Sequence, residues 1–410
     1  MRRHTRWLLG LTAALLSAAT LSTATATATA SAGTAALAVT TTATFNNPAG
    51  TTAEQDKVRD HIVNLVNDAQ SGTSITVSMY NFTDDVVSGA LVAAKQRGVS
   101  VRVILDHTTL TTDGNEYATL TGGLGTDRTK TSWVYACPAG RGCIGSRKLP
   151  GDDGAINHNK IFLFSRVGGA DNVVVQASAN MTGLQRTELF NNAVTIVDSG
   201  LYGIYQAYFA DLLKYGTSSG LSDYYQTPSS GPYKAYFFPR KETAGTQFDG
   251  DAATDTVKLI LDKVGCAGGT EVRMAANLFY RKEVATKLVS LASAGCSVSL
   301  AHDGNPGTAD TPGSLGKTVE GIISGKLTKR VECWENSPSG AKIGLHSKYL
   351  MVSGTYDGVA GKKLVWTGSH NFSYQALRSN DETLLKIDNV ALYNQFKANH
   401  DQLMSYCAGT

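Results

Sequence analysis

The sequence lacks three features that would each place a protein in a broad class. Beyond its N-terminal segment it has no run of about 18 or more apolar residues, the length that a membrane-spanning helix needs. No two cysteines have the Cys-x-x-Cys spacing of many zinc and redox sites. The chain also has almost no excess of one charge, since 37 Lys and Arg residues stand against 34 Asp and Glu residues. These absences argue against a multi-spanning membrane protein, cysteine-bound metal and a strongly basic surface.

The N-terminal segment has the pattern of a secretory signal peptide. Three arginines within the first six residues precede an apolar stretch from Trp7 to Leu21, and an Ala/Thr-rich run with several small-x-small cleavage sites follows. A membrane anchor is the alternative, but the apolar core is short for it. We therefore expect residues 1–38 to be removed and the mature protein to be secreted and soluble.

Removal of that segment changes the charge balance, because its arginines are not matched by any acidic residue. The mature chain would carry equal numbers of basic and acidic residues. A protein that binds nucleic acid regardless of base sequence usually has a basic excess. Global charge therefore gives no support to that role, although a local basic groove remains open.

Six cysteines in an exported chain indicate disulfides rather than metal ligands. Two of them, Cys137 and Cys143, flank a short Pro/Gly loop and could close it. Two more, Cys266 and Cys296, each stand just before a predicted strand and could meet at one end of a sheet. The remaining pair would be Cys333 with Cys407. Other pairings stay open, and this set is the one we favour.

An internal repeat organises the mature chain. Each copy opens with a strand-like run broken by a proline, Pro48 or Pro239, and continues with a helical pattern. In the first copy we predict helices over Ala53–Asp68 and Asp84–Arg97 and strands over Ser74–Tyr80 and Val99–Asp106. In the second copy we predict helices over Ala252–Val264 and Lys282–Ala294 and strands over Glu271–Ala276 and Cys296–Asp303. A glycine, Gly98 or Gly295, ends the second helix of each copy. This alternation predicts an α/β fold of two tandem halves with largely parallel sheets.

The boundary between the copies is expected at residues 215–231, which lack periodicity and are rich in Ser, Gly and Pro. The halves would then cover residues 39–214 and 232–410. Each half contains a long irregular region, Thr108–Gly154 or Gly304–Gly340. Regions of this length are usually functional or mobile, so we expect them to shape a substrate entrance, with surface decoration as the alternative.

Each copy also carries the same series of polar residues. The first copy has His158, Lys160, Ser178, Asn180 and, eleven residues further on, Asn191; the second has His346, Lys348, Ser369, Asn371 and, again eleven residues further on, Glu382. On a strand, residues two apart project from one face, so each histidine should lie beside its lysine. A single His-x-Lys is usually chance, but the series recurs in matching places. The repetition indicates one composite site.

These residue types suit a phosphodiester. Cations and hydrogen-bond donors around the phosphate oxygens lower the barrier to attack, and the lysines, asparagines and serines fit those roles. Histidine can attack phosphorus when neutral or protonate a leaving oxygen when charged. If each copy's Asn191 or Glu382 supports the histidine of the same copy, His346 has a carboxylate that favours its protonated form. On that basis His158 is expected to be the nucleophile and His346 the acid.

At this point the chain resembles the phospholipase D superfamily, whose members carry two HxK(x4)D motifs, each followed by Gly-Ser-x-Asn. The matching segments are His158-Asn159-Lys160 with Ser178-Ala179-Asn180, and His346-Ser347-Lys348 with Gly368-Ser369-His370-Asn371. The resemblance implies a pseudo-twofold α/β sandwich with one active site between the halves, no metal or other cofactor, and a phosphohistidine intermediate. It also implies that alcohols can replace water as the acceptor.

The chain departs from the family pattern at the aspartate of each motif, where Ser165 and Ser353 stand. Seven residues after a histidine is an odd offset, which on a straight strand faces away from the site, so we expect both serines to be structural. The tyrosyl-DNA phosphodiesterase branch of the family also lacks this aspartate, so its absence does not imply inactivity. Asn191, which stands where an acid is expected, leaves the partner of His158 less certain.

The leading hypothesis is a secreted, monomeric phosphodiesterase of phospholipase D type that acts on phospholipid head groups and contacts membrane surfaces transiently. A secreted metal-independent nuclease is the alternative, and its basic path would use Arg128, Lys130, Arg141, Arg147 and Lys148. A third hypothesis, from another class, is a non-catalytic phosphate- or lipid-binding relative that lost activity with the two aspartates.

Overall fold

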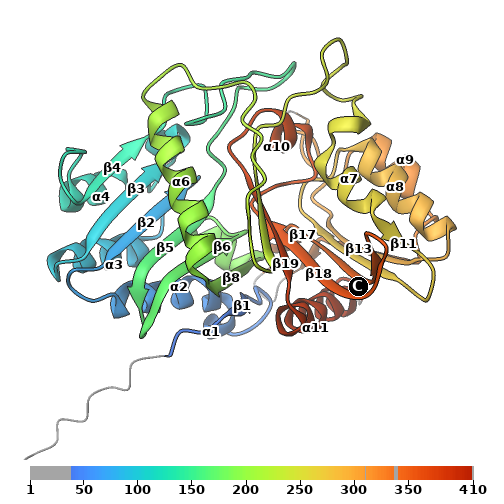
Figure 1. Ribbon diagram of the computed structural model, residues 1–410, viewed down its shortest axis with the longest axis horizontal. Coiled ribbons are helices and arrows are strands. Elements are labelled where there is room, and N and C mark those ends of the chain that lie inside the picture. Colours follow the sequence, from blue (N-terminus) through green and yellow to red (C-terminus); the bar gives the residue numbers. More distant parts are fainter. Residues whose placement is uncertain (1–37, 310, 337–339, 409–410) are drawn as a thin grey trace, which may run out of the picture. The chain divides into compact units, whose positions relative to one another are not determined.

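The computed structural model describes residues 38–309, 311–336 and 340–408, which belong to one unit (Figure 1). All but the last residue of the predicted signal peptide lies outside the described residues. Among the helices that the structure describes, none is both long enough and apolar enough to cross a membrane.

Two sheets reproduce the sequence repeat strand by strand. The first has the order β1-β8-β6-β5-β2-β3-β4, and the second follows the order β10-β19-β18-β17-β12-β13-β14, with β9 and β11 added at its margins. The strands of the first sheet are β1 (Thr42–Phe45), β2 (Ser74–Met79), β3 (Ser100–Leu105), β4 (Trp133–Ala136), β5 (Lys160–Val167), β6 (Ala170–Ala177) and β8 (Asn192–Val197). Those of the second are β9 (Ser229–Ser230), β10 (Tyr233–Phe237), β11 (Val264–Gly265), β12 (Glu271–Ala276), β13 (Ser297–Asp303), β14 (Lys329–Cys333), β17 (Tyr349–Tyr356), β18 (Val359–Gly368) and β19 (Thr383–Asp388). The α/β class and the two-half organisation are confirmed.

The expectation of largely parallel sheets was wrong. Only β2, β3 and β4, and likewise β12, β13 and β14, run parallel, whereas their sheets continue through antiparallel pairs such as β5 with β6 and β17 with β18. Helical crossovers join only the parallel strands. The later strands are joined by a tight turn and a short helix, which favour antiparallel pairing.

Three helices cover the outer face of each sheet. The helices of the first half are α1 (Thr52–Gln55), α2 (Lys57–Asp68), α3 (Asp85–Gln96), α4 (Tyr117–Leu124), α5 (Gly183–Thr187) and α6 (Ser199–Gly216); those of the second are α7 (Thr256–Asp262), α8 (Lys282–Ser293), α9 (Lys317–Ile323), α10 (Tyr374–Arg378) and α11 (Val390–Tyr406). The outer helices are α2, α3 and α4 in the first half and α7, α8 and α9 in the second. Amphipathic α2 and α3 bury Ile62 and Leu91 against the first sheet, as α7 and α8 do against the second. The helices α3 and α8 end at Gly98 (φ +92°) and Gly295 (φ +93°), the left-handed C-cap that the sequence predicted.

The regions 108–154 and 304–340 contain more regular structure than expected. The first holds 3-10 helix η1 (His107–Thr111) with α4 and β4, and the second holds α9, β14 and β15 (Glu335–Asn336). β4 with α4 and β14 with α9 occupy matching places in the two repeats. Among the described residues, the predicted irregularity is limited to shorter loops beside these elements, such as the one from Cys137 to Gly154.

The inner faces of both sheets share one core with α6 and α11. A parallel pair between β7 (Leu189–Phe190) and β16 (Lys342–Leu345) also joins the halves, matching Gly344 with Leu189 and Leu345 with Phe190. The disulfides are Cys137–Cys143, Cys266–Cys296 and Cys333–Cys407, as predicted. The third ties β14 to the end of α11, so it holds the inner helix to the second sheet.

Candidate active site

Each histidine of the repeated series lies just before a strand rather than inside one, contrary to the expectation for His346. His158 precedes β5, and His346 lies between β16 and β17. Their backbones are anchored across the two halves: the His158 N–H donates to the Asp381 carbonyl at 3.0 Å, and the His346 N–H donates to the Phe190 carbonyl at 2.9 Å. Each histidine segment is therefore positioned by the opposite half.

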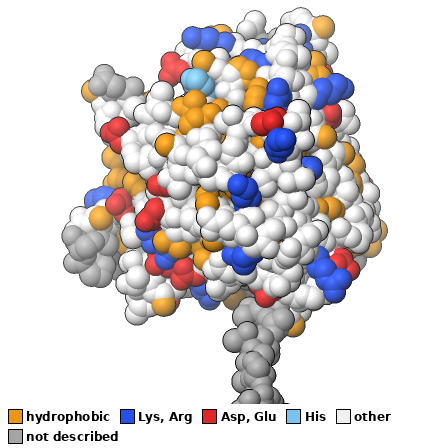
Figure 2. Space-filling view, turned by 90° about the vertical axis from the view of Figure 1, so that its left-hand side faces the viewer, with side chains coloured by type: hydrophobic (Ala, Val, Ile, Leu, Met, Phe, Trp, Pro, Cys, Tyr) orange, Lys and Arg blue, Asp and Glu red, His pale blue; other side chains and the backbone are white. Residues whose placement is uncertain are grey.

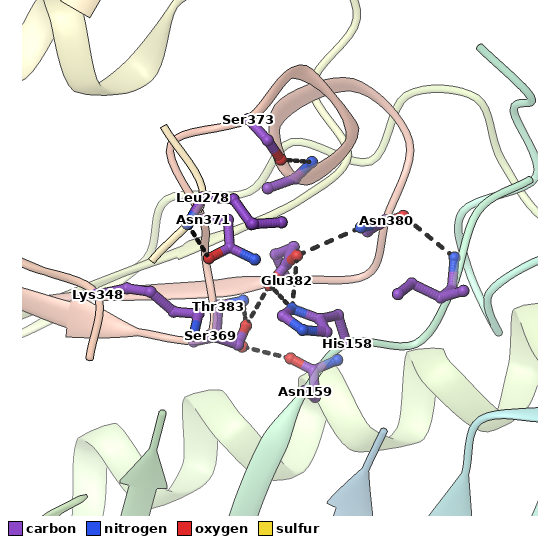
Figure 3. A network of polar contacts seen from close by, with 12 residues as sticks. His158, Asn159, Leu278, Lys348, Ser369, Asn371, Ser373, Asn380, Glu382 and Thr383 are labelled. Carbon is purple, nitrogen blue, oxygen red and sulfur yellow. Dashed lines mark hydrogen bonds and ion pairs between the residues drawn. The ribbon is translucent and has the colours of Figure 1, made fainter. Parts of the chain in front are cut away.

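The same crossing applies to the side chains, and it corrects the sequence interpretation. His158 Nδ1 lies 3.0 Å from Glu382 Oε2 (Figure 3), and His346 Nδ1 lies 3.0 Å from Asn191 Oδ1. Each downstream residue thus supports the histidine of the other copy, not of its own. The reason is the pairing at the boundary between the halves, where Asn157 bridges to Asp381 and β7 runs parallel to β16. The equal spacing of Asn191 and Glu382 within their copies does not show which histidine each of them contacts.

Hydrogen bonds fix which ring nitrogen of His158 is free for chemistry. Ser369 Oγ accepts from the Thr383 N–H, so its own proton goes to Glu382 Oε2, and Asn380 Nδ2 donates to the other carboxylate oxygen. When Glu382 is ionised it can only accept, so the proton between Glu382 and His158 is then on Nδ1. The lone pair of Nε2 then faces away from Glu382.

The amide of Asn191 fixes the tautomer of His346 in the same way. Its Nδ2 donates to the carbonyls of Gln185 and Leu189, so its Oδ1 faces the hydrogen-bond donors on the other side. Ser178 Oγ donates to that Oδ1 at 2.8 Å, and His346 Nδ1 is the second donor. Both rings therefore carry a proton on Nδ1 and present Nε2 to the site.

The role predicted for the two serines is corrected by these contacts. Ser178 and Ser369 are fully buried, and each hydroxyl donates to the residue that holds a histidine. Each also accepts a backbone N–H, from Asn192 or Thr383. A hydroxyl has a single proton to donate, so neither serine is left to bind a substrate oxygen. They position Asn191 and Glu382 instead.

The two asparagines remain available as donors. Asn371 Oδ1 accepts from the Leu278 N–H at 3.5 Å, while Asn180 Oδ1 has no partner in the described part of the chain. Neither side-chain NH₂ donates a hydrogen bond there. Asn180 and Asn371 keep 9% and 6% of their surface exposed, and His158 and His346 keep 7% and 8%. These four side chains therefore each keep a small surface accessible to solvent.

The two lysines lie deeper. Lys160 and Lys348 are almost fully buried, and each ammonium donates to the carbonyl of its neighbouring histidine, His158 or His346. Lys160 Nζ also lies 5.1 Å from the centre of the Tyr80 ring, a cation–π contact. Since an ammonium has three protons, each lysine keeps donors for an anion.

The electrostatics show that the site is short of negative charge. Burial lowers the pKa of Lys160 to about 7, although Glu382 opposes the shift, and burial and then Lys160 push the pKa of Lys348 well below its usual range. Burial followed by the lysines also lowers the pKa of both histidines. Burial raises the pKa of Glu382 to about 8, against the pull of Lys160. A bound anion would stabilise the charged lysines and histidines together.

Three aspartates that support the site were not assigned from the sequence. Asp106 accepts the Asn157 N–H at 2.6 Å, and Asp303 accepts the Leu345 N–H at 2.8 Å, so each fixes the residue before a histidine. Their equal spacing from Gly98 and Gly295 could have revealed this pair. The third, Asp381, accepts the N–H groups of Ile144 and Gly145. It belongs to one half only, and no repeat could have revealed it.

The two serines that replace the family aspartate serve the sheets. Ser165 Oγ accepts the Ser74 N–H at 2.8 Å, which fixes the start of β2, and Ser353 Oγ accepts from Lys363 Nζ. Both lie well along β5 and β17, away from the histidines. These contacts agree with the structural role expected from the odd offset.

Two of the five basic residues considered for a nucleic-acid path are occupied within the fold. Arg141 donates to backbone carbonyls, among them those of Cys143 and Gly216, and Arg147 pairs with Glu242. Figure 2 shows basic and acidic side chains interspersed on the face it presents. In the described ranges, no group of three or more His, Cys, Asp or Glu side chains is placed to hold a metal ion.

Comparison with known proteins identifies the family. A family model described as cardiolipin synthase, PLD-like domain, matches residues 62–213 and 261–404, one match for each repeat. The chain belongs to the phospholipase D superfamily. Members of this superfamily act on phosphodiesters. No curated protein matches the sequence significantly.

Solved structures share the fold at low sequence identity. The phosphatidylserine synthase of Haemophilus influenzae Rd KW20 matches with a TM-score of 0.54 at 12% identity, over 88% of this chain and 85% of its own. The polyphosphate kinase of Porphyromonas gingivalis matches with a TM-score of 0.51 at 12% identity, over 89% of this chain. The chain spans half the length of that kinase. At this identity the likeness concerns the fold.

Proposed function

We propose that the protein is a secreted phosphodiesterase of phospholipase D type, which hydrolyses or exchanges phospholipid head groups through a phosphohistidine intermediate. The crossed arrangement of His158 with Glu382 and His346 with Asn191 carries the proposal. It gives the two histidines different hydrogen-bond partners, and burial followed by the two nearby buried lysines lowers the pKa of both rings. A tetrahedral phosphate needs this combination of attack from one side, proton donation on the other, and cations at its free oxygens.

His158 is the nucleophile in this mechanism. When its Nε2 attacks phosphorus, the ring gains positive charge while Nδ1–H remains bonded to Glu382. The carboxylate stabilises that charge, as an aspartate stabilises the imidazolium of a serine protease. The sequence interpretation reached the same assignment for a reason that the structure overturns, since it gave the carboxylate to His346.

His346 is the general acid. Its neutral partner Asn191 orients the ring without stabilising the imidazolium, so the protonated ring gives up its Nε2 proton readily. That proton goes to the leaving oxygen as the P–O bond breaks and the P–N bond to His158 forms. Lys160 and Lys348 bind the non-bridging oxygens, and the amides of Asn180 and Asn371 complete the set of donors.

The second step reverses these roles. Neutral His346 takes a proton from water or from a primary alcohol, whose oxygen attacks phosphorus as the P–N bond to His158 breaks. Water gives the phosphomonoester and an alcohol gives the exchanged diester. Both outcomes restore neutral His158 and protonated His346, so the cycle closes without a redox partner.

The phospholipid substrate is supported by the balanced charge of the mature sequence and by the internal partners of Arg141 and Arg147. The test is to incubate the purified protein, with a chelator present, with phosphatidylcholine plus a primary alcohol and separately with plasmid DNA. Head-group exchange is the expected result. Cleavage of DNA alone, with a steep fall as salt rises, would make the protein a nuclease. If neither substrate reacts, and His158→Ala and His346→Ala behave as the wild type, the protein is a non-catalytic binder.

A further inference from the structure

Two lysines face each other directly across neighbouring strands of the second sheet. Lys234 on β10 is the register partner of Lys386 on β19. Side chains opposite each other in an antiparallel pair lie on one face with Cβ atoms about 5 Å apart, and like charges there are destabilising. The pair therefore needs an explanation that folding alone does not provide.

The first half offers an internal control at the same position. There, β1 pairs with β8 in the same way, and the register partners are Thr42 and Thr195. Opposed threonines are a favourable cross-strand pair, and Thr195 Oγ1 also lies 2.7 Å from His61 Nε2 on α2. The scaffold therefore does not require lysines at this position.

The covering helix also differs between the halves. The first half has the 12-residue α2 over this face, whereas α7 has 7 residues and ends at Asp262. The shorter helix leaves a cavity of about 320 Å³ open to solvent, with residues of α7 on one wall. Its lining includes Lys234, Lys263 and Lys386 together with Tyr225, Tyr236 and Tyr356.

The charges in this cavity are not balanced. Lys263 pairs with Asp357 and the nearby Lys362 pairs with Asp388. Among the described residues, no carboxylate lies within 4.0 Å of Lys234 or Lys386; their ammonium groups instead lie over aromatic rings, 5.3 Å from those of Tyr236 and Tyr356 respectively. Burial, and then the neighbouring lysines against the opposing effect of Asp388, lowers the pKa of Lys386. An anion between the two ammonium groups would remove the repulsion.

We propose that this cavity, the Lys234–Lys386 pocket, is a second anion site that binds a phosphate group. Lysine is a point-charge ligand for phosphate, and two of them on one face can hold oxygens of one tetrahedral anion. The Tyr225 hydroxyl, which accepts from Thr256 Oγ1 at 3.1 Å, keeps its own proton to donate. The pocket is separate from the catalytic residues, because Lys386 lies four residues along β19 from the Glu382 position, roughly 13 Å at about 3.3 Å per residue.

The test follows the lysines individually. Reductive ¹³C-methylation gives each lysine an NMR signal, and inorganic phosphate is titrated against chloride at matched ionic strength. The signals of Lys234 and Lys386, assigned with Lys234→Gln and Lys386→Gln, should shift and saturate. Each single variant should weaken binding by about tenfold, the loss of one charge-assisted contact. A control, Lys95→Gln with Lys397→Gln, removes two exposed lysines elsewhere and should leave the titration unchanged.

A second arm identifies the source of the phosphate group. Binding to phosphatidylcholine vesicles with and without phosphatidylglycerol is compared for the wild type and Lys234→Gln/Lys386→Gln. Loss of the phosphatidylglycerol-dependent binding identifies a lipid head group; retained vesicle binding with lost phosphate binding identifies a soluble or polymeric phosphate. Shifts that do not saturate, or that equal those of the control lysines, overturn the proposal. Hydrolysis of a soluble diester stays unchanged in the pocket variant, so failure here is distinct from failure of the catalytic proposal.

Discussion

The two halves of this protein have the same strand order and the same His-x-Lys and Ser-x-Asn series, but they differ in the residues that contact the two histidines. Glu382 in the second half corresponds to Asn191 in the first, and the preceding residue is Asp381 in one and Phe190 in the other. In the proposed mechanism, the shared residues form a site that is symmetric toward the phosphate. The residues that differ would then decide which histidine attacks and which donates a proton. On this proposal the repeated residues bind the anion, and the unlike partners of the two histidines give the reaction its direction.

Removal of either histidine is expected to have the largest effect, but in different ways. His158→Ala removes the nucleophile, so activity should fall by roughly 10⁴-fold or more with every substrate. His346→Ala removes the proposed acid, a loss of about 10²- to 10⁴-fold. The rate of the first step should recover with a leaving group such as p-nitrophenolate that needs no proton, whereas the second step, in which His346 is the base, should stay slow. Pre-steady-state rates of leaving-group release from natural and p-nitrophenyl diesters test this.

Trapping the intermediate tests the same comparison directly. In His346→Ala, a reaction quenched with alkaline denaturant, which preserves the acid-labile P–N bond, should leave a phosphorylated peptide that contains His158. A label on His346 in the His158→Ala variant would show that His346 is the nucleophile and His158 the acid. Equal leaving-group dependence in both variants would also contradict the assignment.

The next effect concerns Glu382 and Asn191. Glu382→Gln keeps the hydrogen bond to His158 but removes the charge that stabilises the phosphorylated ring, so kcat should fall by about 10²-fold or more. Asn191→Ala, which removes a neutral partner, should cost less. Single-turnover phosphorylation rates separate the two. If the double variant Glu382→Gln/Asn191→Glu moves the phosphoryl label to His346, the partner rather than the position selects the nucleophile.

The sequence predicted the helices and strands better than the hydrogen-bond partners within the site. Periodicity and the C-cap glycines located β2, α3, β3 and their repeats to within a residue or two, because these patterns record local burial and backbone conformation. Crossing of Glu382 to His158 depends on how two halves pair, which spacing within one half does not encode. The roles of Ser178 and Ser369 were missed for the same reason, since a hydroxyl's partner is decided by residues far along the chain.

A smaller effect should arise from Asp381, which has no counterpart in the first half. Burial raises its pKa to about 7 against the pull of backbone N–H donors from Gly145 and Ile144. The folded state then binds more protons than the unfolded state between about pH 4 and pH 7, so this group makes stability fall as pH rises across that range. Asp381→Asn should flatten the slope of unfolding free energy against pH by about 1 kcal/mol per pH unit.

The measurement is urea unfolding of the wild type and Asp381→Asn from pH 4 to pH 8. Glu382, whose pKa burial also raises, contributes a slope of the same sign in both proteins, so the difference between the curves reports Asp381. Asp60→Asn, which replaces a half-exposed carboxylate on α2, is the control and should leave the slope unchanged. An unchanged slope in Asp381→Asn would show that Asp381 is ionised throughout this range.

The smallest expected effect concerns the Lys234–Lys386 pair, which we expect to make the second half less stable than the threonine pair of the first half would. Lys234→Thr/Lys386→Thr gives the second sheet the pair that the first has in Thr42 and Thr195. Removal of the like-charge contact should stabilise the fold by about 0.5 kcal/mol, since loss of the cation–π contacts offsets part of the gain. The melting temperature in chloride should rise by about 1–2 °C, and added phosphate should narrow the difference by stabilising only the wild type. A lower melting temperature of the variant in chloride would mean that the two lysines stabilise the fold. The difference between the halves at this position would then not indicate a bound anion.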